Sequence, residues 1–190
     1  MKNNIYIISG PSGAGEDSVI EGLKKYFPIE RIITTTTRAM RTGESQGNPY
    51  YFISKEDFQK NILANNFFEY AEEYNNNYYG VTKTEIERVQ NSDKIGIWKI
   101  EYKGVITAKK LLPKIIAIFL NAPLEILEQR IRQRDNATEE YISERLTYTR
   151  EWLKHKDIYD YEVINEQGKL AEAIEKIANI IIKHKNTENN

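Results

Sequence analysis

A glycine-rich segment near the N-terminus has residue types and spacing suited to binding phosphate. Residues 10–15, Gly-Pro-Ser-Gly-Ala-Gly, follow the apolar run 5–8 and precede residues 18–26, where apolar side chains recur at helical spacing. Such glycines let backbone N–H groups point toward phosphate oxygens at a helix N-terminus. The segment predicts a phosphate-binding loop; a strand-to-helix turn that binds nothing is the alternative. The residues expected to contact phosphate are Gly10, Ser12, Gly13, Ala14, Gly15, Asp17 and Ser18.

The residues after this loop depart from the usual pattern, G-x-x-x-x-G-K-[ST]. In that pattern the lysine neutralises phosphate charge and the hydroxyl residue binds magnesium. Glu16 stands at the lysine position, Asp17 follows it, and Ser18 comes one place later than the usual hydroxyl. A carboxylate at position 16 would repel phosphate groups, most strongly in a dry site. Asp17 and Ser18 are the candidate magnesium ligands.

Two arginines and a glutamate further along the chain are a second group of candidate ligand-binding residues. Arg38 and Arg41 follow the threonine run 34–37, and planar guanidinium groups match the geometry of phosphate oxygens. Glu69 lies between Phe68 and Tyr70. Without further motifs, two arginines three apart are more often solvated surface residues than ligands, and Glu69 is compatible with the solvent face of a strand.

Alternating strands and helices predict an α/β fold that would position these residues. Continuous apolar runs at 95–100 and 115–120 are typical of parallel strands covered on both faces. A parallel β-sheet flanked by helices, with right-handed crossovers, is therefore expected. Further strands are expected near 50–53, 67–74, 78–81 and 162–165, and helices at 18–26, 55–64, 82–91, 124–134, 139–155 and 170–183.

Composition narrows the classes of protein that this chain can be. Its 190 residues suit a single domain, and a formal net charge of −1 gives no bulk attraction for nucleic acid. The absence of cysteine excludes disulfides and Cys-ligated zinc, and His155 and His184 are too far apart to suggest a metal site. The apolar run at 5–8 is too short for a signal peptide or membrane span, so we expect a cytoplasmic protein without a membrane partner.

Five motifs in order make the chain resemble the guanylate kinase family over roughly residues 5–182. They are Ile-Ser-Gly-Pro-Ser-Gly-Ala-Gly at 8–15, Thr-Thr-Thr-Thr-Arg-Ala-Met-Arg at 34–41, Gly-Glu at 43–44 with Gly-Asn-Pro-Tyr-Tyr-Phe at 47–52, Phe-Phe-Glu-Tyr-Ala at 67–71, and Asn-Tyr-Tyr-Gly-Val-Thr at 77–82. The resemblance implies an inserted GMP-binding lobe with mixed secondary structure, a helical lid, and ATP and GMP as substrates with magnesium bound to ATP.

The resemblance also assigns a GMP site. Arg38 and Arg41 would hold the GMP phosphate, and Glu69 would accept from guanine N1–H and the 2-amino group, a donor pair that adenine lacks. Hydroxyl groups of Thr34, Tyr50 and Tyr79 would donate to the same phosphate. Val81 departs from the family, which usually has a hydroxyl there touching the base; Thr82 is the possible substitute.

Arginines of the second half of the chain match the family's lid. Such residues close over the triphosphate and stabilise the charge of the transferring phosphoryl group. Arg130, Arg132 and Arg134 match the lid helix, and Arg145 and Arg150 match two later family arginines. Among these, Arg130 is expected at the ATP phosphates, Arg134 and Arg145 in catalysis, and Arg145 also at GMP, whereas Arg132 is compatible with an ordinary surface position.

A second departure from the family is opposite in sign to the first. Where the family reads Leu-Asp-Ile-Asp, this chain has Trp98, Lys99, Ile100 and Glu101, so Lys99 replaces an aspartate and Glu101 retains an acidic group at the GMP site. Lys99 and Glu101 are two residues apart and would share one face of a strand. Our hypothesis is that Lys99 reaches the phosphates in place of the loop lysine, with Glu16 or Asp17 orienting it or helping to hold hydrated magnesium.

These expectations give one favoured function and two alternatives. The favoured one is a guanylate kinase, in which ATP and GMP give ADP and GDP. The alternatives are an inactive guanylate kinase-like module that binds GMP or a phosphopeptide, and a kinase acting on another small phosphate-bearing substrate. The expected organisation is a core at 1–33, 91–123 and 156–185, a GMP-binding lobe at 34–90, a lid at 124–155 and a disordered tail at 186–190; the oligomeric state is left open.

Overall fold

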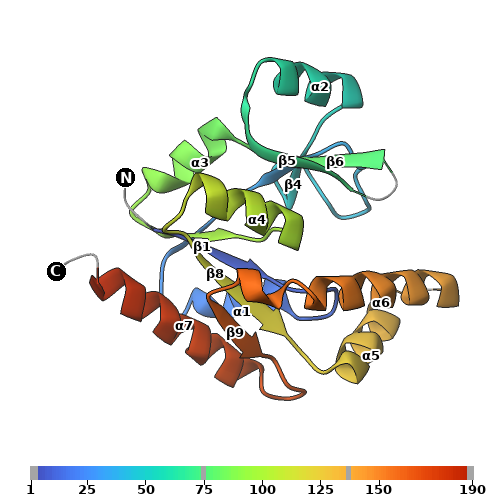
Figure 1. The fold of residues 1–190 in the computed structure, drawn as a ribbon, viewed down its shortest axis with the longest axis vertical. Helices are drawn as coiled ribbons and strands as arrows, with labels where there is room; N and C mark the ends of the chain where they lie inside the picture. The colour runs from blue at the N-terminus through green and yellow to red at the C-terminus, as the bar shows by residue number, and fades with distance from the viewer. Residues whose placement is uncertain (1–3, 74–75, 136–137, 188–190) are drawn as a thin grey trace.

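A computed structural model describes residues 4–73, 76–135 and 138–187. Its larger sheet has five parallel strands in the order β2-β7-β1-β8-β9. Their bounds are β2 Ile29–Arg31, β7 Ile95–Trp98, β1 Ile5–Ser9, β8 Ile116–Asn121 and β9 Tyr161–Ile164. This arrangement confirms the predicted α/β fold with a parallel sheet (Figure 1).

Helices cover both faces of the larger sheet because alternate residues of β1 point to opposite sides. Tyr6 and Ile8 pack in a core cluster with residues of α1 (Glu16–Leu23) and α7 (Leu170–Thr187). Ile5 and Ile7 pack in a second cluster with residues of α3 (Lys83–Gln90) and α4 (Tyr102–Leu111). The central strand is therefore buried on both faces, as its uninterrupted apolar sequence predicts.

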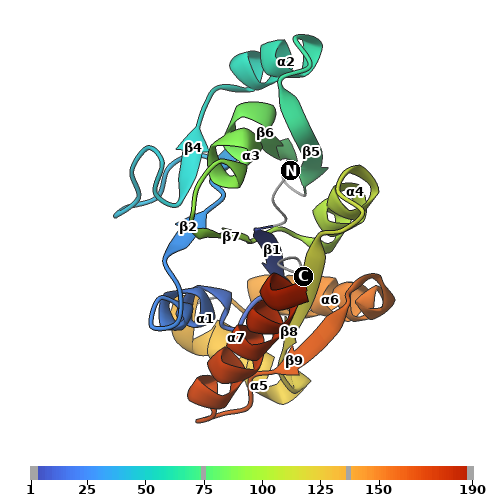
Figure 2. The same cartoon turned by 90° about the vertical axis from the view of Figure 1, so that its left-hand side faces the viewer.

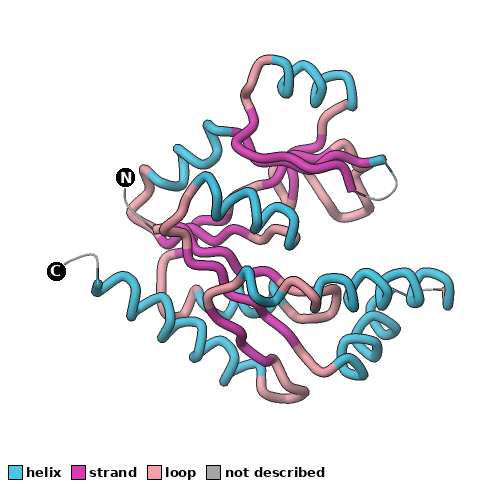
Figure 3. The backbone as a smooth tube through the Cα atoms, viewed as in Figure 1, coloured by secondary structure: helices cyan, strands magenta, loops and turns pink. Residues whose placement is uncertain are grey.

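A smaller sheet forms a separate lobe above the larger one (Figures 1 and 3). Its strands follow the order β4-β3-β6-β5 and are mixed in direction. Their bounds are β3 Thr34–Thr36, β4 Tyr50–Phe52, β5 Phe67–Glu73 and β6 Asn77–Thr82, and α2 (Lys55–Leu63) packs on the lobe through Phe58, which stacks on Phe67.

Two helices on the other side of the molecule form the segment expected to be the lid. They are α5 (Leu124–Asp135) and α6 (Glu139–Leu153), followed by the short 3-10 helix η2 (Lys156–Ile158). In Figure 2 the view is turned, and the smaller sheet and the α5–α6 pair again lie at opposite ends of the molecule. Trp152, near the end of α6, packs with Tyr102 and Phe119.

The structure corrects several expected element bounds. Strands β2 and β3 and helix α4 were not expected, and β7 ends at Trp98, so Lys99 and Ile100 lie beyond the strand. Helix α1 begins at Glu16 rather than Ser18. Helix α7 continues to Thr187, so the prediction of a disordered tail from residue 186 was wrong at its start, while residues 188–190 lie outside the described part of the chain.

Candidate active site

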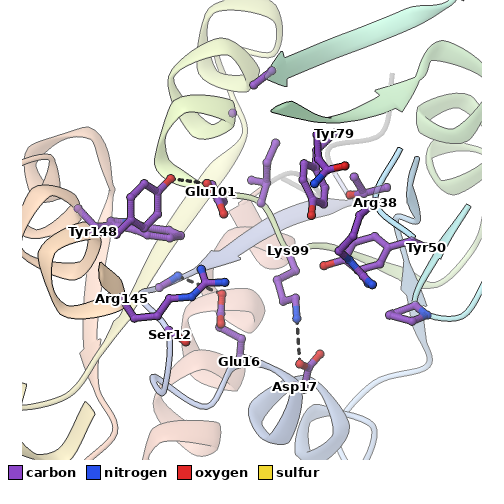
Figure 4. A pocket seen from close by; sticks show the side chains of 18 of the residues that line it. Ser12, Glu16, Asp17, Arg38, Tyr50, Tyr79, Lys99, Glu101, Arg145 and Tyr148 are labelled. Atoms are coloured by element: carbon purple, nitrogen blue, oxygen red, sulfur yellow. Dashed lines mark hydrogen bonds and ion pairs between the residues drawn. The ribbon is translucent and has the colours of Figure 1, made fainter. Parts of the chain in front are cut away.

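A cavity of about 360 Å³ lies between the phosphate loop, the smaller sheet and helix α6. Figure 4 shows side chains from all three regions pointing into it. The lining residues that sequence analysis singled out are Gly10, Ser12, Glu16, Asp17, Thr34, Arg38, Arg41, Tyr50, Glu69, Tyr79, Lys99, Glu101 and Arg145. Residues from positions 10 to 145 thus meet at one cleft.

Backbone geometry gives the glycine-rich segment the form of a phosphate-binding loop. Gly15 has φ +95° and caps α1, a conformation that an L side chain rarely adopts. A side chain at Gly10 would meet the carbonyl oxygen of Leu120 at 2.1 Å, so only glycine allows this approach to β8. Asn165 fixes the other side of the loop, since its Nδ2 donates to the carbonyl of Ala14 at 2.8 Å. The loop therefore delivers the N-terminus of α1 to the cleft.

Glu16 turns back onto this loop. Its Oε1 accepts a hydrogen bond from the backbone N–H of Gly10 at 3.2 Å. In Figure 4 its carboxylate lies on the same side of the cleft as Ser12 and the Arg145 guanidinium. The Glu16 carboxylate thus accepts from a loop N–H group of the kind that binds phosphate oxygens.

Lys99 reaches the first turn of α1 from the opposite side of the cleft. Its Nζ lies 2.8 Å from Oδ2 of Asp17, and Oδ1 of Asp17 lies 2.6 Å from Nη2 of Arg31 (Figure 4). Of the two acidic residues expected to orient Lys99, Asp17 makes the ion pair. One carboxylate therefore bridges two cations, and sequence analysis did not single out Arg31.

The protonation states in this cluster follow from its charges. Burial acts to raise the pKa of Asp17, but the nearby charges of Lys99 and Arg31 outweigh it and lower that pKa to about 2. Burial likewise acts to lower the pKa of Lys99, yet the carboxylates of Glu16 and Asp17 leave it raised above its usual value. Lys99 is therefore positively charged at neutral pH, and it lines the cleft beside the first turn of α1.

Arg38 is held in the smaller lobe by a carboxylate and by aromatic rings. Its Nη2 donates to both carboxylate oxygens of Glu44, at 2.8 and 3.0 Å, and its guanidinium lies 5.4 Å from the ring centres of Tyr50 and Phe52. Burial raises the pKa of Tyr50, so its hydroxyl keeps the proton that it would donate. Glu44 also accepts from the backbone N–H of Arg41. Together these contacts fix the position of the Arg38 guanidinium at the edge of the cleft.

Glu69 is the buried acidic group of the same lobe. Its side chain is 6% exposed, lines the cavity, and lies opposite Val81 in the pairing of β5 with β6. Val81 is completely buried and belongs to the core cluster of α3 and α4. A side chain at Gly104 would stand 3.5 Å from Oε2 of Glu69. The same side chain would meet Cδ1 of Ile100 at 2.2 Å, so glycine at position 104 lets Ile100 pack closely against α4 beside the carboxylate.

Glu101 and Arg145 lie at the boundary between the cleft and α6. Glu101 precedes α4 and accepts a short hydrogen bond from the hydroxyl of Tyr148. Arg145 lines the cavity one turn earlier on α6, with its guanidinium 5.1 Å from the ring centre of Tyr141. Tyr148 and Trp152, which also line the cavity, were not predicted; aromatic residues four apart on a helix are the signal that points to this face.

Among the lid arginines whose side chains the structure describes, Arg145 alone lines the cleft. Arg130 donates to the carbonyls of Gly13 and Asn165, so it braces the phosphate loop from outside. Arg132 pairs with Glu128 and Glu139 on the surface, as its alternative interpretation held. Arg150 is exposed, and the side chain of Arg134 lies outside the described residues. Ser18, a candidate metal ligand, is exposed on α1.

The fold and the loop define a class of protein. The chain begins with a strand, a glycine loop and a helix N-terminus, which belong to a parallel sheet and its covering helices. An inserted lobe faces the loop across a cleft lined by carboxylates, arginines, a lysine and tyrosines. This is the architecture of a nucleotide kinase of the P-loop superfamily.

Comparison with known proteins identifies the family. The guanylate kinase family model matches residues 2–184. The guanylate kinase of Rickettsia felis is 37% identical over 95% of this chain and 94% of its own, and that of Buchnera aphidicola is 38% identical over 94% and 86%. A crystal structure of guanylate kinase from Anaplasma phagocytophilum has a TM-score of 0.74 at 24% identity, covering 95% of this chain and 85% of that one. The chain belongs to the guanylate kinase family, which is a family of enzymes.

No helix in the described ranges combines the length and the apolar sequence needed to cross a membrane.

Proposed function

We propose that this chain transfers the terminal phosphoryl group of ATP to GMP, with Lys99 acting in place of the loop lysine. The observation that carries the proposal is the Lys99 ammonium, whose Nζ is 2.8 Å from Asp17 in the first turn of α1. An oxygen of the GMP phosphate forms a bond to the γ-phosphorus, the bond from that phosphorus to the β–γ bridging oxygen breaks, and ADP leaves with the electron pair. Positioning and charge neutralisation supply most of the catalysis in such a transfer.

ATP and GMP would bind on opposite sides of the cleft. Gly10, Ser12 and the N-terminus of α1 would bind the ATP phosphates, with Arg130 bracing the loop. Arg38, Arg41, Thr34, Tyr50 and Tyr79 would bind the GMP phosphate. Arg145 would contact the transferring group from α6, and Arg134 is proposed to join it from α5.

Guanine would be selected by Glu69. Its buried carboxylate offers two acceptor oxygens to the adjacent N1–H and 2-amino donors, and burial makes an unmatched donor or acceptor costly. Glu101 would border the nucleoside, whereas Val81, expected at the GMP site, packs in the core cluster and is not among the residues that line the cavity.

Magnesium would enter bound to ATP and shared with protein oxygens. Hard oxygen donors suit this ion, and Glu16, Asp17 and Ser12 provide them at the mouth of the loop. Both oxygens of Asp17 pair with cations, and Glu16 accepts from the Gly10 N–H, so binding the ion would replace one of these contacts. The exposed Ser18 is the remaining candidate. When bound, the ion neutralises charge on the ATP phosphates.

A non-catalytic module that binds GMP or a phosphopeptide is the second candidate. The hydrogen bond from the Gly10 N–H to Glu16 favours this second candidate, because Glu16 would compete with an ATP phosphate for the loop. Such a module would bind GMP but not ATP.

An ADP-release assay with GMP, ATP and magnesium, using AMP as the control acceptor, separates the two. GMP-dependent turnover above the ATPase background supports the kinase. Without turnover, a melting temperature that still rises on adding GMP but not ATP would support the binding module.

A further inference from the structure

The segment that carries Lys99 is held by side chains rather than by the sheet. Among the described residues, the ladder of β7 with β1 ends at the pair Ile7 and Trp98. Three contacts then fix the next three residues: Lys99 pairs with Asp17, the carbonyl of Ile100 accepts from Ser9, and Glu101 accepts from Tyr148. The position of Lys99 therefore depends on the groups that hold Ile100 and Glu101.

A directed chain of hydrogen bonds runs from α6 to this segment. The indole Nε1–H of Trp152 donates to the hydroxyl oxygen of Tyr159 at 2.9 Å, and the hydroxyls of Tyr159 and Ser9 are 2.9 Å apart. Ser9 uses its one proton on the carbonyl of Ile100, at 2.6 Å. Tyr159 must therefore donate to Ser9, and every donor in the chain has one acceptor.

Burial makes this chain sensitive to the loss of any member. Ser9 is completely buried and Trp152 is 4% exposed. Burial, the largest influence, raises the pKa of Tyr159 to about 12 against the opposing hydrogen bonds, so its proton stays available for donation at any working pH. Removing the Tyr159 hydroxyl would leave the Trp152 N–H without its acceptor and Ser9 without its donor.

The chain joins three parts of the proposed active site. Ser9 is the last residue of β1 and directly precedes the phosphate loop, Ile100 follows Lys99, and Trp152 lies four residues after Tyr148 on α6. Tyr148 and Trp152 thus reach the two residues after Lys99 from one helix face, directly in one case and through Tyr159 and Ser9 in the other.

We propose that Tyr159 is a positioning residue that sets the place of Lys99 over the phosphate loop by linking Trp152 of α6, through Ser9, to the carbonyl of Ile100. This inference rests on the proposed role of Lys99 in binding the ATP phosphates. Tyr159 itself touches no substrate.

The test compares Tyr159→Phe with Tyr161→Phe. The control also removes one partly buried tyrosine hydroxyl, which bonds to Nε2 of His184 at 2.8 Å, away from the cleft. Tyr159→Phe is expected to lower kcat about 10- to 100-fold, because it would displace Lys99, and to leave KM for GMP unchanged. Tyr161→Phe is expected to leave kcat unchanged. Equal kcat values for the two variants would overturn the proposal.

A second variant tests the route through Ser9. Ser9→Ala removes the bond to Ile100, so it should lower kcat by a similar factor, and the double variant with Tyr159→Phe should be no worse than either single one. If the two losses multiply instead, Tyr159 does not act through Ser9.

A readout independent of turnover is the 13Cε chemical shift of Lys99 at one fixed pH, assigned with Lys99→Arg. Tyr159→Phe should change this chemical shift because Lys99 moves relative to Asp17, while Tyr161→Phe leaves it in place. An unchanged resonance in Tyr159→Phe contradicts the inference. An inactive wild type in which the change still occurs contradicts the proposed function alone.

Discussion

Lys99 and Asp17 form an ion pair of 2.8 Å across the mouth of the phosphate loop. The pair joins the residue after β7 to the first turn of α1, and Arg31 holds the second oxygen of the same carboxylate. Glu16 and Asp17 bring two negative charges to this corner, and Lys99 and Arg31 bring two positive ones. The negative and positive charges of these four side chains therefore balance. Because Asp17 is ion-paired, it would repel a phosphate at the loop less than an unpaired carboxylate would.

Lys99→Ala should lower kcat about 100- to 1000-fold, because removing one preorganised charge that stabilises a transition state typically costs this much. GMP binding should be nearly unaffected, since Lys99 faces the ATP side of the cleft. Steady-state kinetics and GMP titration measure the two effects. Lys110→Ala, an exposed lysine of α4, serves as the control; normal turnover in Lys99→Ala would remove Lys99 from the mechanism.

The double variant Lys99→Asp with Glu16→Lys should recover part of the activity that Lys99→Asp alone loses. Lys99→Asp alone would place three carboxylates near the loop, whereas adding Glu16→Lys returns a lysine to the position after Gly15. We expect the second change to rescue the first, with a coupling of about 1–3 kcal/mol from a double-mutant cycle. Strictly additive changes in the activation free energy would show that positions 16 and 99 act independently.

Asp17 should stabilise the fold less as the solution becomes acidic. Its folded pKa of about 2 is below the usual 3.8, so the unfolded chain binds the proton more readily, and the contribution is lost as pH falls from about 4 to about 2. With the side chain 59% exposed, the effect should be about 1 kcal/mol or less. Urea unfolding of wild type and Asp17→Asn should differ at pH 6 and converge near pH 2; a constant gap would contradict the assignment.

Glu69→Gln should lower kcat/KM for GMP about 100-fold or more, because one amide cannot accept from both guanine donors. Turnover with AMP should not fall with it. Glu72→Gln, on the same strand but exposed, is the matched control and should behave as wild type. Equal losses in the two variants would mean that Glu69 acts through the stability of the lobe.

Local patterns predicted the parts of the molecule that local sequence determines. The buried strand before the glycine loop, the helix after it, and the polar lobe all follow from periodicity and turn residues. Helix α4 was missed because Gly104 and the apolar residues around it blur the helical period. Strands β2 and β3 were missed because three residues are too few to show alternation.

Site residues that lie within the family motifs could be predicted from the sequence, whereas those outside the motifs could not. Lys99 was placed near the loop from the family resemblance and from a charge change opposite to that at Glu16, but its partner was left open between Glu16 and Asp17. Arg31 carries no local signal, because its partner Asp17 is 14 positions away. The aromatic spacing on α6 indicates a helix face but not that Tyr148 contacts Glu101, which is 47 positions away. Such contacts are set by how the sheet and α6 pack, which one sequence does not contain.

The raised pKa of Lys99 also governs its chemical reactivity. An amine attacks an acyl group only when deprotonated, and Glu16 and Asp17 keep this one protonated. Acylating nucleotide reagents that modify lysines beside phosphate loops would find no lysine at position 16 and a poor nucleophile at position 99. Reversible binding is therefore a better measure of ATP occupancy in this chain than acylation of Lys99.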